Sequence, residues 1–123
     1  MARELAPSTL QRLERRLEDE RDRLVSILKE IDLQREARRL AESASEHNPD
    51  PDNADGGSIA LEMEMDVSLE QNTKQLLEKV LHAQDRMEKG LYGICEVTGN
   101  PIPVARLEAL PYATTTVEAV FRR

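Results

Sequence analysis

Apolar residues recur every three or four positions through the first third of the chain. Alternating steps of three and four place such side chains on one stripe of an α-helix, as in a coiled-coil seam. Pro7 followed by Ser8 or Thr9 as N-cap is typical of a helix start, so we predict a helix over about 9–45, roughly 55 Å long at about 1.5 Å per residue. The stripe consists of Leu10, Leu13, Leu17, Leu24, Ile27 and Ile31, with Glu20 interrupting it once.

The stripe becomes polar beyond Ile31, where the same positions hold Gln34, Arg38 and Ala41. The proximal half of the helix therefore has an apolar surface for a partner helix, and the distal half does not. We expect the distal end to project into solvent or into another protein. Two copies of the chain could also associate weakly through this apolar stripe.

A break in the helical pattern covers residues 46–57, which contain two prolines, two glycines and several Asn and Asp residues. These residues cannot continue a helix and favour turns. A second helix is predicted from near Ser58 to Lys89-Gly90, where glycine suits the C′ position. Two long helices with a short connection lie antiparallel, so the break is the tip of a hairpin. The second helical stripe consists of Leu69, Leu76, Val80, Ala83 and Met87, flanked by Leu77 and Leu81.

The composition supports an elongated shape. The chain has 123 residues with one Phe, two Tyr and no Trp, and 33% of its residues are charged, which leaves little material for a broad core. No stretch approaches the roughly 18 to 20 apolar residues of a membrane span, and the N-terminus lacks the apolar block of a signal peptide. We therefore predict a cytoplasmic protein without a membrane partner.

The net charge of −7 is concentrated in one segment. Residues 1–45 and 71–123 are each nearly balanced, whereas residues 46–70 hold eight acidic groups and no basic group. Such a segment repels nucleic acid and suits a site that meets cations, metal ions or a basic protein surface. No basic stripe interleaved with aromatic residues is present, so direct nucleic-acid binding is not expected.

Catalysis finds little support in the sequence. Cys95, His47 and His82 are dispersed, and the chain has neither a glycine-rich phosphate loop nor a plausible Ser-His-Asp order. We predict that the protein is not an enzyme.

The last third of the chain has the spacing of a four-cysteine zinc ribbon that has lost three ligands. A structural zinc needs two close ligand pairs, usually two CxxC knuckles. Here the pairs are Cys95-Glu-Val-Thr98 and Thr116-Val-Glu-Ala119. Threonine and alanine cannot replace thiolates, so no zinc is predicted. Cys95 is then either a small, half-buried apolar residue or a reactive thiol.

A ribbon without metal must be stabilised by packing, because about 30 residues fall below the size that normally folds alone. We expect a short hairpin around Thr98–Asn100. A short terminal helix is expected from about Thr115, capped within the Thr114-Thr-Thr116 run and docked near Leu13, Leu17 and Met87. The apolar residues available are Ile94, Val97, Ile102, Val104, Leu107, Leu110, Val117 and Phe121.

The order Tyr92-Gly-Ile-Cys95, then Gly99-x-x-Ile102, then Arg106-Leu-Glu-Ala-Leu-Pro-Tyr-Ala113 resembles the DksA/TraR family of bacterial RNA polymerase regulators. The resemblance implies a globular zinc-ribbon module beside a long antiparallel coiled coil. It also implies that the tip of the coiled coil enters the secondary channel of the polymerase, the pore through which nucleotides reach the active centre.

The resemblance assigns a role to the hairpin tip. Asp52 and Asp55 match the two acidic positions of the family's tip motif DxxDxA, Gly57 replaces its alanine, and Asp50 adds a further acid. Carboxylates there are implied to contact polymerase elements near the catalytic Mg²⁺. The alternative is a solvated Asx-rich turn. A calcium loop fits poorly, because its third acid is displaced and Leu61 stands at position twelve.

In some family members the alarmone ppGpp binds where the coiled-coil base meets the polymerase. Leu76 and Lys79 match two of those positions, whereas Leu110 and Val120 stand where the family has basic groups for phosphate. Each lost charge-assisted hydrogen bond is worth roughly 1.5 to 3 kcal/mol, so dependence on ppGpp is not expected. Lys79 has a simpler alternative role in a surface ion pair.

Together these observations predict a mostly α protein with a coiled-coil hairpin over 1–90, its acidic tip at about 46–58, and a degenerate zinc-ribbon-like module over 91–123. The predicted function is transcription regulation, as in a stress response, with core RNA polymerase as partner. The alternative is a non-transcriptional coiled-coil adaptor or assembly protein that kept the shape of the family.

Overall fold

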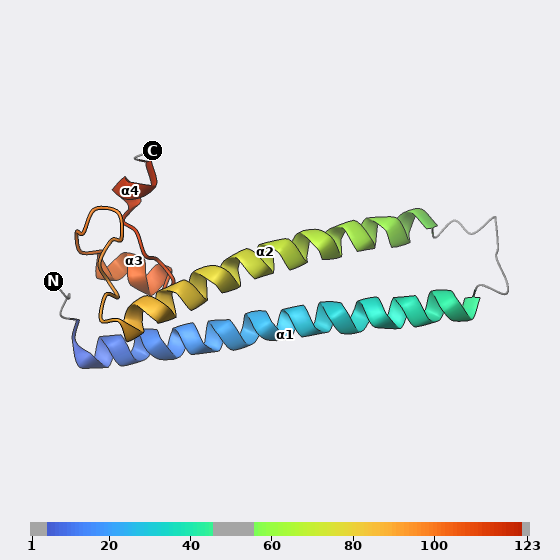
Figure 1. The fold of residues 1–123 in the computed structure, drawn as a ribbon, viewed down its shortest axis with the longest axis horizontal. Helices are drawn as coiled ribbons and strands as arrows, with labels where there is room; N and C mark the ends of the chain where they lie inside the picture. The colour runs from blue at the N-terminus through green and yellow to red at the C-terminus, as the bar shows by residue number, and fades with distance from the viewer. Residues whose placement is uncertain (1–4, 46–55, 122–123) are drawn as a thin grey trace.

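The computed structural model describes residues 5–45 and 56–121, and this part of the chain forms four helices. α1 (Pro7–Ser45) and α2 (Gly56–Glu88) run antiparallel, close together near the module and further apart toward the other end of the hairpin (Figure 1). α3 (Val104–Ala109) and α4 (Val117–Phe121) lie at the end of the hairpin where α1 begins and α2 ends. The predicted class, a long helical hairpin with a small C-terminal module, is confirmed.

Both long helices begin slightly earlier than predicted. α1 starts at Pro7, so Ser8 and Thr9 lie within its first turn and neither is the N-cap. Proline suits the first helical position because its fixed φ is helical and its missing N–H would have no partner there. α2 starts at Gly56, ahead of Ser58. The predicted end of α2 is confirmed, since Gly90 has a φ of 74° just beyond Glu88.

The proximal seam of the hairpin is apolar, as its periodicity indicates. Leu13, Leu17, Leu24 and Ile31 of α1 are buried, and Val80 and Ala83 of α2 are buried with them. Thr73 of α2 is also buried. The hydrophobic pattern did not predict this, because threonine is polar. By contrast, Leu69 is 47% exposed, so its placement on the packed stripe was wrong, and Leu81, predicted beside the stripe, is 46% exposed. In this part of α2 the residues that face α1 are Glu70 and Thr73. Leu69 therefore lies beside the interface between the helices.

The distal half of the hairpin is held by ion pairs between its two helices. Arg35 of α1 pairs with Glu70 of α2, and Arg38 pairs with Asp66. Lys74 also binds Glu70 at 3.1 Å. The hydrogen bond from Lys74 lowers the pKa of Glu70, and the positive charge of Arg35 adds to this shift. Arg38, one of the polar positions that follow the apolar stripe, therefore joins the two helices by charge, together with Arg35.

The module between α2 and α4 folds around a tight turn. Ile94 and Pro101 form an antiparallel bridge, and Cys95 N donates to Asn100 O at 2.8 Å. Gly99 has a φ of 75°, a left-handed conformation that side chains disfavour. The hairpin predicted around Thr98–Asn100 is thus present as one bridge closed by a turn. α3 was not predicted, because its six residues are too few to show a clear helical period.

The module shares one core with the base of the hairpin. Cys95, Ile102, Leu107 and Ala119 belong to the same buried cluster as Leu13 and Leu17, with Met87 packed against it. The predicted docking of the module on this end of the hairpin is therefore confirmed. Val97, Val117 and Phe121 are 63%, 52% and 83% exposed, so their assignment to the packing surface was wrong. The module is too small to bury both faces of α4.

Within the described ranges, no helix combines the length and apolar character that crossing a membrane requires.

Candidate functional site at the base of the hairpin

The four positions with zinc-ligand spacing meet in the folded module. The sulfur of Cys95 accepts hydrogen bonds from Thr98 N at 3.4 Å and from Thr116 Oγ1 at 3.8 Å. Thr116 Oγ1 accepts in turn from Ala119 N at 3.3 Å, which caps the start of α4 as predicted. A thiol–hydroxyl network centred on Cys95 therefore joins the two former knuckles.

Cys95 is more deeply enclosed than the sequence suggested. Only 1% of its surface is exposed, whereas half-burial was expected. Burial raises the pKa of the thiol, but hydrogen bonds to the sulfur from Thr98, Thr116 and Val97 lower the pKa to about 6. The sulfur thus keeps a donor-rich environment suited to a thiolate, in a place that solvent hardly reaches.

The residues at these four positions do not fit the zinc of a C4 finger. Tetrahedral zinc takes four thiolate or imidazole ligands, and here one thiol faces two hydroxyls and a methyl group. The hydroxyl of Thr116 is already engaged with Cys95 and Ala119. In the described part of the chain, no three His, Cys, Asp or Glu side chains gather closely enough to hold a metal ion.

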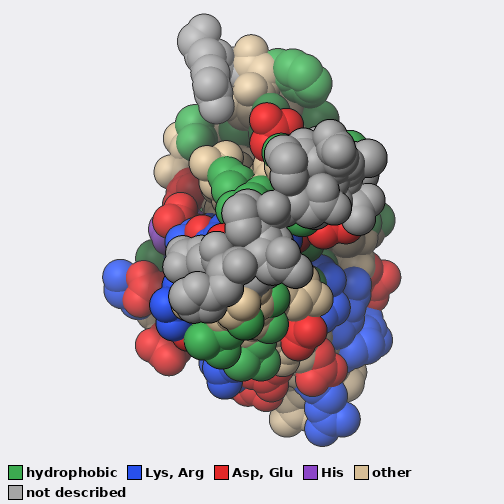
Figure 2. Space-filling view, turned by 90° about the vertical axis from the view of Figure 1, so that its right-hand side faces the viewer, with side chains coloured by type: hydrophobic (Ala, Val, Ile, Leu, Met, Phe, Trp, Pro, Cys, Tyr) green, Lys and Arg blue, Asp and Glu red, His purple; other side chains and the backbone are tan. Residues whose placement is uncertain are grey.

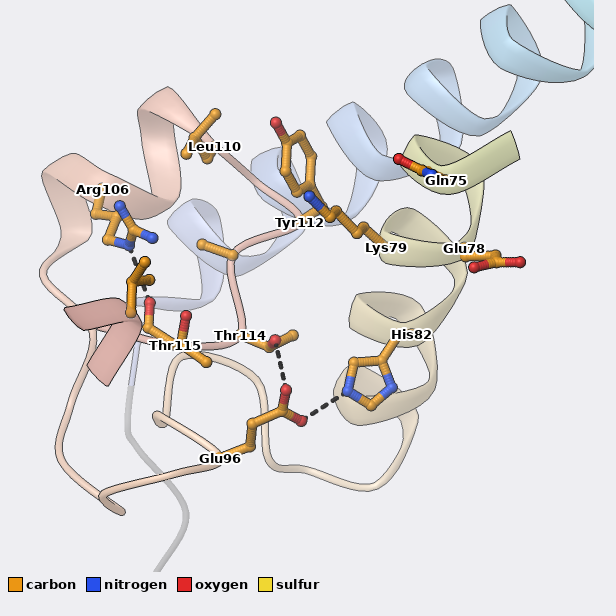
Figure 3. A pocket seen from close by; sticks show the side chains of 12 residues that line it. Gln75, Glu78, Lys79, His82, Glu96, Arg106, Leu110, Tyr112, Thr114 and Thr115 are labelled. Atoms are coloured by element: carbon orange, nitrogen blue, oxygen red, sulfur yellow. Dashed lines mark hydrogen bonds and ion pairs between the residues drawn. The ribbon is translucent and has the colours of Figure 1, made fainter. Parts of the chain in front are cut away.

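A second polar cluster joins the module to α2. Glu96 contacts His82 Nε2 at 2.7 Å and accepts a hydrogen bond from Thr114 Oγ1 at 3.0 Å (Figure 3). Arg86 lies 3.8 Å from the same carboxylate and donates to the carbonyl of Ile94 at 2.9 Å. This cluster was not predicted from the sequence. Its only trace in the sequence is the i, i+4 spacing of His82 and Arg86, which does not indicate a partner 10 residues or more away.

The Glu96 cluster predicts an acid-sensitive contact. Burial raises the pKa of Glu96, but its contacts with His82, Thr114 and Arg86 outweigh burial, so the pKa is lowered. The contribution of Glu96 to stability is thus complete above its unfolded pKa of about 4.3 and is lost as the pH falls through the lowered folded value. We expect Glu96→Gln to destabilise the protein by about 1 kcal/mol at pH 7 and by less at pH 3. Urea unfolding at both pH values measures this, and an equal loss at both would contradict the assignment.

A pocket of about 590 Å³ opens beside this cluster, between α2 and the module (Figure 3). Lys79 lines it, as do Leu110 and Val120, the two positions where the family resemblance implied basic groups. Leu76 lines a different pocket of about 500 Å³, between α1, α2 and the loop after α3. The two candidate alarmone residues therefore do not share one pocket. Lys79 forms no ion pair within the described residues, so its alternative role in a surface pair finds no support.

Of the four candidate tip residues, the structure describes one. Asp50, Asp52 and Asp55 lie outside the described residues. Gly57 lies in the first turn of α2, at the end of the hairpin opposite the module.

Comparison with known proteins identifies the family to which this fold is related. Residues 90–122 match the family described as prokaryotic dksA/traR C4-type zinc finger. Over 106 residues the chain is 35% identical to the RNA polymerase-binding transcription factor DksA of Caulobacter vibrioides (strain NA1000 / CB15N), covering 86% of this chain and 74% of that protein. It is 38% identical over 100 residues to General stress protein 16O of Bacillus subtilis (strain 168), covering 79% of this chain but only 61% of that relative.

A solved structure supports the same placement. The transcription factor DksA2 from Pseudomonas aeruginosa matches with a TM-score of 0.70 and 27% identity, covering 95% of this chain and 84% of that one. The protein is thus a long helical hairpin with a small C-terminal module at its base, and this module is related to a zinc ribbon. The chain belongs to the DksA/TraR family.

Proposed function

We propose that this protein is a transcription regulator that binds bacterial RNA polymerase. It inserts the acidic tip of its hairpin into the secondary channel and modulates initiation without contacting DNA. Family membership supports the polymerase as partner, because the Caulobacter relative is named as an RNA polymerase-binding transcription factor. A role as a non-enzymatic regulator agrees with the transcription factors among its relatives.

The single observation that carries the proposal is the shape of the hairpin. α1 has 39 residues and α2 has 33, and they extend together far beyond the module (Figure 1). Two interhelical ion pairs, Arg35–Glu70 and Arg38–Asp66, join the helices beyond the apolar seam. A long helical hairpin that projects away from its base suits insertion into a channel. The eight acids among residues 46–70 suit an encounter with cationic groups and disfavour DNA.

We further propose that the protein works without resident zinc and without ppGpp. The donor set around Cys95 is unsuited to zinc, and the hydrogen bonds of Thr98 and Thr116 take over the joining of the two knuckles. Leu110 and Val120 offer no charge to phosphate. In this proposal residues 1–90 act as the lever and residues 91–123 as the base, in the cytoplasm, where polymerase works.

Binding of the purified protein to core RNA polymerase tests the proposal. We expect a direct complex in fluorescence anisotropy or native gel assays, and competition with a DksA protein for the same polymerase. A variant in which a short Gly/Ser linker replaces residues 36–70 keeps the buried seam but loses the distal part of the hairpin, and it should no longer affect initiation. Recovery of a different partner, with no binding to polymerase, would favour the adaptor alternative and overturn the proposal.

A further inference from the structure

The distal part of α2 exposes an apolar stripe that no described residue covers. Leu61, Met65 and Leu69 are 58%, 61% and 47% exposed. They are spaced at i, i+4 and i+8, so they lie on one face of the helix. Large apolar side chains gathered in this way on a surface mark interaction sites more often than chance exposure does.

The other flank of the same segment is also apolar. Met63 and Val67 are 47% and 46% exposed, and they line a groove of about 300 Å³ between the two helices. Three arginines and one glutamate of α1 form the opposite wall of that groove: Arg35, Arg38, Arg39 and Glu42. Viewed along the hairpin from the end away from the module, hydrophobic side chains lie directly beside acidic and basic ones (Figure 2).

The acidic residues of this segment differ in whether a basic residue pairs with them. Asp66 and Glu70 are matched by arginines of α1, whereas Glu62 and Glu64 form no ion pair with any residue in the ranges 5–45 and 56–121. No basic residue occurs between Ile59 and Glu70. The outward face of this segment therefore combines exposed apolar side chains with carboxylates whose charge is not compensated.

Exposed apolar side chains together with unpaired carboxylates restrict the kind of partner that this surface can bind. A second copy of the chain would bring carboxylates against carboxylates, and nucleic acid or an anionic membrane would be repelled in the same way. A protein surface with apolar side chains flanked by Lys or Arg satisfies both features, and the i, i+4, i+8 spacing suits docking along a helix or into a groove. We propose that the α2 segment Ile59–Leu69 is a docking surface for a basic, apolar protein surface, which under the proposed function belongs to the polymerase.

The test compares two matched double variants. Leu61→Gln/Met65→Gln removes the two most exposed residues of the stripe, and Leu33→Gln/Leu40→Gln changes two leucines of α1 that are 66% and 56% exposed. Glutamine keeps the helix propensity and the charge, so both variants should fold like the parent in circular dichroism. We expect the α2 variant to bind core RNA polymerase at least about tenfold more weakly, and the α1 variant to bind within about twofold of the parent.

Failure of the docking surface and failure of the proposed function would give different results in these experiments. Binding of the α2 variant at parental affinity would overturn the docking surface while leaving the function standing. If the parent itself does not bind polymerase, the proposed function falls, and with it the partner named here. A concentration-dependent dimer of the parent that the α2 variant abolishes in analytical ultracentrifugation would assign the surface to a second copy and overturn the inference. A weaker salt dependence of binding in Glu62→Gln/Glu64→Gln would support it.

Discussion

Replacing Leu17 with alanine is expected to lower the free energy of unfolding by about 2–5 kcal/mol. Leu17 has no exposed surface, and its buried cluster joins α1, α2 and the module. Removing its side chain leaves a cavity where three parts of the protein meet, and a chain with so little core has few other contacts to compensate. Urea unfolding followed by circular dichroism measures the change.

Leu33→Ala provides the matched control on the same helix. Leu33 is 66% exposed in the distal half, so the same substitution should change the free energy of unfolding by at most about 0.5 kcal/mol. Similar losses in both variants would show that the stability of the hairpin does not come from a core at its base.

Restoring cysteines at the three changed positions is expected to create a zinc site. The Cys95 sulfur and Thr116 Oγ1 lie 3.8 Å apart, close to the separation of about 3.8 Å between two sulfurs bound to one zinc at about 2.3 Å each. The triple variant Thr98→Cys/Thr116→Cys/Ala119→Cys should bind about one zinc per chain and become more heat-stable with zinc than with a chelator. Zinc analysis and thermal unfolding measure both effects.

The zinc-binding experiment has two controls, the parent protein and a variant without the Cys95 thiol. The parent protein should contain far less than one zinc per chain, and adding Cys95→Ser to the triple variant should weaken zinc binding strongly. One zinc per chain in the parent would overturn the proposal that the module works without metal. Absence of zinc from the triple variant would show that the four positions do not converge as described.

The regular parts of the fold were predictable because their signals are local. A repeat of three and four over Leu10 to Ile31 determines both a helix and the face that it buries. Gly90 marks the end of α2 in the same way. The ribbon spacing correctly grouped Cys95 with Thr116 and Ala119, since paired knuckles imply proximity across about 20 residues.

Contacts that depend on the meeting of distant segments could not be predicted. The cluster of Glu96 with His82 and Arg86 arises only when the module docks on α2, and no periodicity records it. The exposure of Phe121 likewise follows from the small size of the module, whose described residues leave one face of α4 uncovered. Arg38 was predicted to lie beyond the end of the packed seam, yet its ion pair with Asp66 continues the contact between the helices, as does that of Arg35 with Glu70.

The effect of Asp52→Asn/Asp55→Asn on promoter initiation in a purified transcription system decides whether an acidic tip acts on the polymerase. Both substitutions remove charge while nearly preserving side-chain size, and neither alters the seam or the module. We predict that the double variant binds core RNA polymerase with nearly the affinity of the parent and has lost the parent's effect on initiation. Binding and an effect on initiation that both equal those of the parent would contradict the insertion of an acidic tip.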